Sequence, residues 1–219
     1  MVNEYIKKQL RNYLARVKEF GPVGKNTGFK LEQNTTIKFV IPLLNILGWD
    51  HLKNDMGFEY PVRGRKEKKK EGRCDIALYT DYPKSKKPKV LVEIKRIQVP
   101  EEKLESGRYL LEYLNATKIN YGIFTDGKEL KLVDRRTPTR SHPEGLFSLE
   151  ANHFLDYPDV LWMLSKEMVS KGKLDEFAHA YHFEPNFFKW AKSEKTGDVD
   201  PKKYKLRLEF TRRFLKKEL

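Results

Sequence analysis

The chain has 219 residues, of which 39% are hydrophobic and 34% charged, so it can bury the core of one ordinary domain but not two large ones. Its 44 Lys and Arg residues exceed its 31 Asp and Glu residues, and the net charge of +13 points to polyanionic partners. The single cysteine, Cys74, excludes an intramolecular disulfide, no apolar run approaches the roughly 18 residues of a membrane span, and both features fit the cytoplasm.

Helical spacing of apolar residues marks two segments near the N-terminus. Residues 2–19 form the first, and residues 30–47 form the second after a Gly-rich break. Pro42 is an internal irregularity of the second helix, and Gly48 is its C-cap. Glu32 is expected on the first turn of that helix.

Strand patterns follow, and a helix interrupts them. The expected strands cover 57–62, 74–79 and 89–95, and their order suggests a meander. Residues 101–116 have the pattern of a helix, and residues 119–134 hold two β-type runs around Asp126-Gly127, a strong hairpin signal. From about residue 150 the pattern changes to helical pieces at 158–170, 173–182 and 201–218. We therefore divide the chain into a core, 1–150, and a helical extension, 151–219.

Basic residues gather in four runs, at 63–70, 84–89, 135–140 and 202–217. Any single run is explained as a solvated loop or helix face, but four together favour phosphate contacts with nucleic acid over an acidic membrane. The residues that we assign to nucleic-acid binding are Arg65, Lys68, Lys69, Lys86, Lys87, Arg135 and Arg136.

Acidic residues interrupt two of the expected strands. Side chains alternate along a strand, so Glu93 and Lys95 point the same way, and Asp75 points away from the apolar face of its own strand. If both strands pack their apolar faces on one core, Asp75, Glu93 and Lys95 converge on the other surface. A Glu-x-Lys pattern on a half-exposed strand is common and carries little weight by itself.

Two carboxylates at short range repel each other unless a cation lies between them. Mg²⁺ prefers oxygen ligands and is typically held by one or two carboxylates, as Asp75 and Glu93 would provide. Such an ion acidifies a bound water and polarises a phosphoryl group, and Lys95 would lie beside that water or the scissile phosphate.

An ordered set of motifs over roughly residues 28–134 resembles a known family. Glu32-x-x-Thr35 leads into PLLNILGWD, an EYPV strand follows, and GRCDIAL precedes the Glu93-Ile94-Lys95 strand. The segment EYLNATKINYGIFTDG completes the order. The set resembles the PD-(D/E)xK nuclease superfamily, and within it the N-terminal nuclease domain of the type I restriction endonuclease motor subunit.

The resemblance implies an α/β fold of the restriction-endonuclease type, with a mixed central β-sheet flanked by helices. It implies Mg²⁺-dependent cleavage of DNA, with Mn²⁺ as a substitute, by a free-standing relative of these domains. Asp75 and Glu93 would be metal ligands, Lys95 the catalytic lysine, and Glu32 a further acid that helps to hold the metal. Tyr113 and Tyr109 are assigned an auxiliary role, although Tyr109 stands where the family usually has Gln.

Two other functions stay open at this point. The chain could be a non-catalytic nucleic-acid-binding or assembly subunit that retains the fold, or its polyanion could be structured RNA. A homodimer and a partner subunit of a restriction-like system are both compatible with the sequence.

Overall fold

The computed structural model describes residues 2–20, 32–62, 72–95, 100–136 and 146–183. Its helices are α1 (Glu4–Phe20), α2 (Glu32–Thr35), the π-helix η2 (Thr36–Val40), α3 (Ile41–Ile46), α4 (Pro100–Thr117), the 3₁₀-helix η3 (Ala151–His153), α5 (Pro158–Trp162), α6 (Lys166–Ser170) and α7 (Lys173–Phe183). Its strands are β1 (Met56–Val62), β2 (Gly72–Leu78), β3 (Val90–Ile94), β4 (Tyr121–Thr125), β5 (Glu129–Asp134) and β6 (Phe147–Glu150).

The strands of the described residues form one mixed sheet in the order β1-β2-β3-β4-β5-β6. β3 and β4 are parallel and are connected through α4, whereas every other neighbouring pair is antiparallel. The expected meander of three strands and the hairpin around Asp126-Gly127 are both confirmed. The α/β class with a mixed sheet flanked by helices is confirmed too, whereas strand β6 was not predicted.

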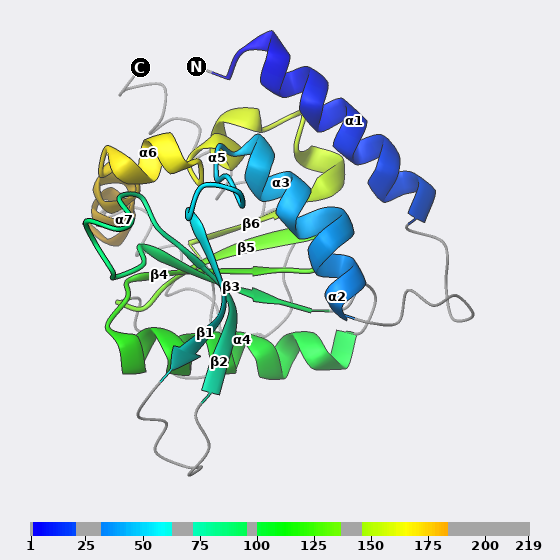
Figure 1. The fold of residues 1–219 in the computed structure, drawn as a ribbon. Helices are drawn as coiled ribbons and strands as arrows, with labels where there is room; N and C mark the ends of the chain where they lie inside the picture. The colour runs from blue at the N-terminus through cyan, green and yellow to red at the C-terminus, as the bar shows by residue number, and fades with distance from the viewer. Residues whose placement is uncertain (1, 21–31, 63–71, 96–99, 137–145, 184–219) are drawn as a thin grey trace.

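Helices cover both faces of the sheet (Figure 1). One face carries Val90, Val92 and Ile94 of β3 and packs in a large cluster with α1, η2, α3, α5 and α7. The opposite face carries Ala77 and Leu91 and packs against α4 in a smaller cluster. The side of β3 that bears Glu93 and Lys95 is therefore covered by a helix, which corrects the expectation of a half-exposed strand.

The predicted helix 30–47 forms as the consecutive pieces α2, η2 and α3. Pro42 lies at the start of α3 and has no N–H to donate to the residue four positions earlier, so the regular α-helical bonding is interrupted near this point. Gly48 follows the helix with φ +82°, and the amide of Trp49 donates to the carbonyl of Leu44 at 3.0 Å. This arrangement confirms Gly48 as the residue that ends the helix.

The predicted helix 158–170 is wrong in its extent, because α5 ends at Trp162 and α6 begins at Lys166. Ser165 caps α6 by accepting a hydrogen bond from the amide of Met168 at 3.2 Å. The Lys166 amide donates to the carbonyl of Leu47 at 3.0 Å, which ties α6 to the end of α3.

The helices after residue 150 share the core of the sheet, since Phe154 and Phe177 belong to the same cluster as Val92. The division of the chain at residue 150 stays a prediction, and the expected helix 201–218 lies outside the described residues. None of the described helices has both the length and the apolar character needed to cross a bilayer.

Candidate active site

Antiparallel pairing of β2 with β3 brings the two predicted acids together. Ile76 lies opposite Val92, and one step further along both strands Asp75 reaches the level of Glu93. The amide of Ile94 donates a hydrogen bond of 2.6 Å to Oδ2 of Asp75, which holds this carboxylate against β3. Glu93 lies on the same side of β3 as Leu91, which packs against α4. On β2 the alternation is interrupted near Asp75, because Cys74 and Ala77 both pack in that cluster.

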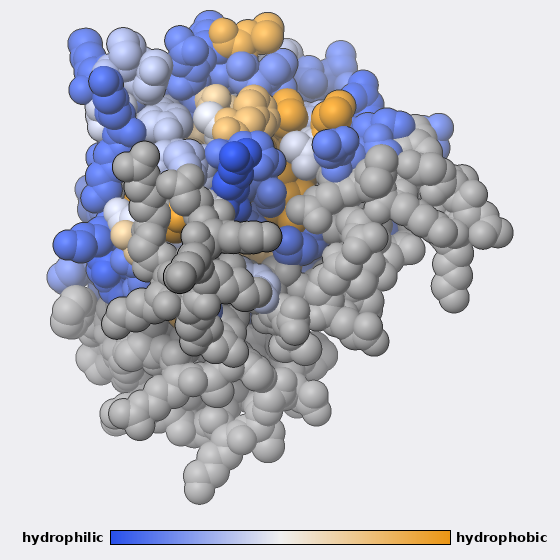
Figure 2. Space-filling model, turned by 60° about the horizontal axis from the view of Figure 1, so that its bottom comes forward, coloured by the Kyte–Doolittle hydropathy of each residue, from blue (hydrophilic) through white to orange (hydrophobic). Residues whose placement is uncertain are grey.

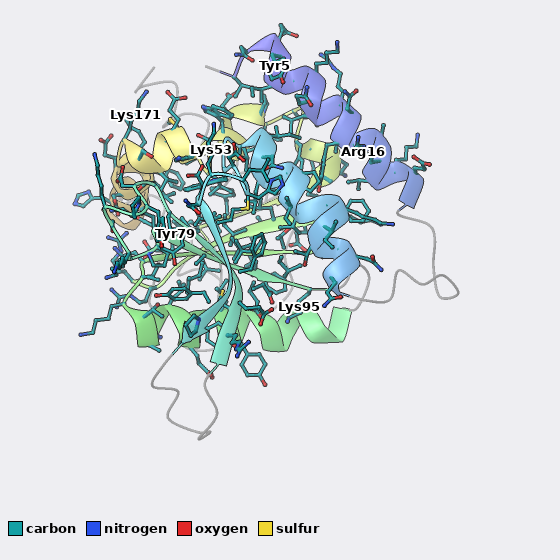
Figure 3. The ribbon with its side chains drawn as sticks, in the orientation of Figure 1. Tyr5, Arg16, Lys53, Tyr79, Lys95 and Lys171 are labelled. Atoms are coloured by element: carbon teal, nitrogen blue, oxygen red, sulfur yellow. The ribbon has the colours of Figure 1, made fainter. Side chains whose placement is uncertain are left out.

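Lys95 completes the group. Its Nζ lies 3.1 Å from Oε1 of Glu93, and both side chains are mostly buried, with 17% and 7% of their surfaces exposed. The amide of Lys95 donates to the carbonyl of Thr125 at 3.0 Å, so the backbone at this position is fixed by the neighbouring strand. Figure 3 labels Lys95 at the end of β3. The structure therefore brings Asp75, Glu93 and Lys95 together as predicted.

The electrostatic environment of the group is negative. Burial raises the pKa of the neighbouring Cys74 thiol, and the charges of Glu93 and then Asp75 raise it further. The Cys74 thiol itself is buried and donates to the carbonyl of Val92 at 3.2 Å. The two carboxylates supply oxygen donors of the kind that a hard divalent cation prefers.

The described residues supply two acidic groups at this point and not three. No set of three or more His, Cys, Asp or Glu side chains within the described part of the chain is arranged to hold a metal ion. The predicted third acid, Glu32, is the first residue of α2, but its side chain lies outside the described residues.

The helix that begins with Glu32 nevertheless runs to the same end of the sheet as Lys95. A Cβ built on Gly127, in the turn after β4, would lie 2.6 Å from Cβ of Phe39 in η2, so the two backbones nearly touch. β4 ends at Thr125, the residue that binds the Lys95 amide. Glu32 precedes Phe39 by seven residues, or about 10 Å of helix. Figures 1 and 3 draw α2 and Lys95 toward the same side of the molecule.

The two tyrosines of α4 differ in their surroundings. Tyr113 is buried, and its ring lies 3.0 Å from where a Cβ on Gly72 would be, so it packs directly on β2. Tyr109 lies one turn earlier on α4 and is partly exposed. Tyr113 thus helps to hold α4 on the strand that carries Asp75, and the auxiliary role of both tyrosines stays a prediction.

The predicted phosphate contacts fall in three places. Arg65, Lys68 and Lys69 lie outside the described residues. Lys86 and Lys87 are exposed in the loop between β2 and β3, at the end of this hairpin away from Asp75 and Glu93. The ammonium of Lys87 donates to the carbonyl of Lys118 at 3.2 Å. Lys118 was missed by the sequence analysis, although its place directly after a predicted helix was a signal for an exposed base.

Arg135 and Arg136 are engaged within the molecule. The Arg136 guanidinium donates to the buried Asp134 at 2.9 Å and to the Tyr121 hydroxyl at 2.6 Å. The hydrogen bond to Asp134 is the main cause of a raised pKa at Arg136. Arg135 donates to Oδ1 of Asn120 at 3.0 Å. The charge of Arg136 thus faces a buried carboxylate, and the predicted phosphate contacts of both arginines stay a prediction.

Comparison with known proteins places this arrangement in a family. Neither a search of curated proteins nor a search of solved structures returned a match. The family model described as "Type I restriction enzyme R protein N terminus (HSDR_N)" matches residues 35–146, which are 112 of the 219 residues. The matched segment includes β1 to β5, α4 and the three residues Asp75, Glu93 and Lys95. The chain belongs to the family of type I restriction enzyme R protein N termini.

Proposed function

We propose that the chain is a metal-dependent endodeoxyribonuclease of the PD-(D/E)xK type, which hydrolyses phosphodiester bonds in DNA. The observation that carries the proposal is that Asp75, Glu93 and Lys95 meet at one end of the β2–β3 pair. Asp75 is held across the strands by the Ile94 amide, and the Lys95 ammonium lies 3.1 Å from the buried Glu93 carboxylate. Membership in a restriction-enzyme family supports the same reaction class.

Asp75 and Glu93 would hold the metal ion, Mg²⁺ or Mn²⁺, with Glu32 as a third acid from α2. The bound ion would supply an acidified water and would neutralise charge on the phosphoryl oxygens. The fit rests on the donors present, because the carboxylates of Asp75 and Glu93 supply the oxygen ligands that such an ion prefers.

The protein's own groups would position the metal ligands and stabilise charge on the phosphate. The Ile94 amide holds one oxygen of Asp75, and the burial of Glu93 keeps most of its surface away from bulk water. Nζ of Lys95 lies 3.1 Å from Oε1 of Glu93, and this ammonium would stabilise negative charge that develops on the phosphate. The backbone bond from Lys95 to Thr125 limits the movement of that ammonium.

Cleavage of supercoiled plasmid with Mg²⁺ or Mn²⁺ tests the proposal. Wild-type protein should cut, whereas Asp75→Asn and Lys95→Gln should lose at least about 100-fold in rate, as expected when a metal ligand or an electrostatic stabiliser is removed. DNA binding in EDTA is measured for each variant, so that a loss of cutting is separated from a loss of binding. Lys53→Gln removes an exposed lysine before β1 and should cut as wild type does. It controls for the loss of one positive charge and for contaminating nucleases carried through purification.

The products also report on assembly. A homodimer that presents two sites to opposite strands would convert supercoiled plasmid directly to the linear form, whereas a single site would first produce the nicked circle. A wild-type protein that binds DNA and does not cut with either metal would refute the nuclease and would favour the non-catalytic binding subunit.

A further inference from the structure

The end of the sheet away from Asp75 and Glu93 carries a group of exposed lysines. They lie in the loop from Tyr79 to Lys89, which holds Lys84, Lys86, Lys87 and Lys89 against the single acid Asp81. Lys118 adds a fifth cation, because the Lys87 ammonium binds its carbonyl. Figure 2 shows the left side of the molecule, where this loop lies, as hydrophilic. The five lysines and Asp81 give this surface a net charge of +4, so phosphate groups would find several donors together.

Two tyrosines stand in the same loop. The rings of Tyr79 and Tyr82 meet edge to face, with centroids 5.6 Å apart and an interplanar angle of 70°. Tyr79 is supported from below by β1, since a Cβ on Gly57 would lie 3.2 Å from its ring. Tyr82 is 48% exposed. A fixed ring thus holds a second, half-exposed ring beside the lysines, and Figure 3 places Tyr79 far from Lys95.

Exposed aromatic rings among lysines match the requirements of unpaired nucleic acid. Phosphates need cations, and unpaired bases gain about 1–3 kcal/mol each by stacking on an aromatic side chain. Paired bases in a duplex present no free face to such a ring. The combination therefore favours a single strand over a duplex at this surface.

We propose that the surface formed by Tyr79, Tyr82, Lys84, Lys86, Lys87, Lys89 and Lys118 binds a single-stranded segment of DNA. β3 separates it from the candidate active site, since the six steps from Lys89 to Lys95 span about 20 Å. If the nuclease proposal holds, on which this substrate assignment rests, the preferred substrate has an unpaired strand about six nucleotides from the bond that is cut. Flaps, gaps and frayed ends have this form.

Binding without metal tests the surface independently of cleavage. The anisotropy of a fluorescent oligothymidylate is measured in EDTA for wild type and for Tyr82→Leu, with circular dichroism to verify folding. We expect Tyr82→Leu to weaken binding by roughly 5- to 150-fold. The matched control is Tyr5→Leu, at a tyrosine of α1 that is 66% exposed and should leave binding unchanged.

The lysines are tested through the salt dependence. The double variant Lys86→Gln/Lys87→Gln should lower the slope of log K against log salt by about 1.4, or about 0.7 for each lost phosphate contact with a single strand. The control double variant is Lys53→Gln/Lys171→Gln, at two exposed lysines of other segments (Figure 3).

Three results would overturn the assignment: Tyr82→Leu and the lysine variant both bind as wild type does, duplex DNA competes as well as the single strand, or single-stranded RNA competes better. The outcome is separate from that of the nuclease proposal. If both variants lose binding and the wild type never cuts DNA, the nuclease proposal is refuted and the single-strand surface is supported. If both variants bind normally and the wild type cuts, the single-strand surface is refuted and the nuclease proposal is supported.

Discussion

Asp75 is the residue at which folding and metal binding can be separated, because its hydrogen bond to Ile94 and its negative charge can be removed one at a time. Oδ2 accepts the 2.6 Å hydrogen bond from the Ile94 amide, and the negative charge of the group is what a metal ion needs. Asp75→Asn retains an oxygen that can accept the amide and removes the charge. Asp75→Ala removes both. The pair of variants therefore distinguishes a structural role from a metal-binding role.

The sizes of the effects follow from this contact. A hydrogen bond to a charged acceptor is worth about 1.5–3 kcal/mol, so Asp75→Ala should lower the melting temperature by roughly 3–12 °C in a chain of this size. Asp75→Asn keeps a neutral hydrogen bond and relieves repulsion with Glu93, so its metal-free stability should stay within about 1 kcal/mol of wild type. A divalent ion at about ten times its dissociation constant should stabilise wild type by about 1.4 kcal/mol, or roughly 3–6 °C.

Thermal unfolding is followed in EDTA and in a series of Mg²⁺ and Mn²⁺ concentrations, with Ca²⁺ as an ion that binds oxygen ligands but has different geometric demands. Wild type should show the metal-dependent rise, and Asp75→Asn should show none while it melts near the wild-type temperature in EDTA. The reasoning is refuted if Asp75→Asn retains the full metal-dependent rise, because the charge of Asp75 would then take no part in holding the ion.

Two further predictions concern the fold that supports the site. Gly127 has φ +82° and a Cβ there would lie 2.6 Å from Phe39, whereas Gly172 has φ +73° with open space around it. Gly172→Ala should therefore lower the free energy of unfolding only by the strain of the left-handed conformation, about 1–2 kcal/mol. Gly127→Ala should lower it by roughly 1–3 kcal/mol more, because the new methyl group also meets Phe39. Urea unfolding measures both values, and equal losses of stability would contradict the close contact. Burial, and then the charge of Asp126, raises the pKa of Tyr13 above that of an unfolded tyrosine. Above about pH 10 the unfolded chain therefore loses this proton while the folded protein keeps it. The free energy of unfolding should fall by about 1.4 kcal/mol per pH unit in that range, and this effect is absent below about pH 10. Melting temperatures from pH 8 to 11 should fall less steeply for Tyr13→Phe than for wild type, and parallel curves would exclude Tyr13 as a cause.

The sequence predicted the structure best where a local residue pattern is compatible with only one backbone conformation, such as the two-residue alternation of a strand or an Asp-Gly turn. Alternation along β3 was enough to place Glu93 with Leu91, because a slip of one residue would have moved the apolar residues out of the core. On β2 alternation was not enough, because Cys74 and Ala77 both pack against α4, and the pairing of Ile76 with Val92 brings Asp75 to the level of Glu93. The Asp126-Gly127 hairpin was predicted for the same reason, since few sequences favour the positive φ that this turn requires.

Features that depend on distant partners were not predicted. β6 has only four residues, and its identity as a strand comes from pairing with β5 and from the burial of Phe147 and Leu149. Arg136 looked like one of a run of surface bases, but Asp134 and the Tyr121 hydroxyl hold it. Local charge does not show which carboxylate a guanidinium will meet, although the Asp-Arg-Arg order placed an acid two residues away.

The burial of Glu93 is the feature that folding alone does not explain. Every residue of β3 is buried, and the other four are Val90, Leu91, Val92 and Ile94, so an apolar side chain in place of Glu93 would suit both neighbouring strands and α4. Buried ion pairs can often be replaced by apolar residues without loss of stability, so the contact of Glu93 with Lys95 does not by itself account for an acid at this position. The proposed metal ion would give Glu93 a role at this buried position that an apolar residue could not fill, because a carboxylate can bind the ion and an apolar side chain cannot. A buried acid on an otherwise apolar strand is therefore what the proposed nuclease function predicts, whereas a purely structural strand would favour a fifth apolar residue.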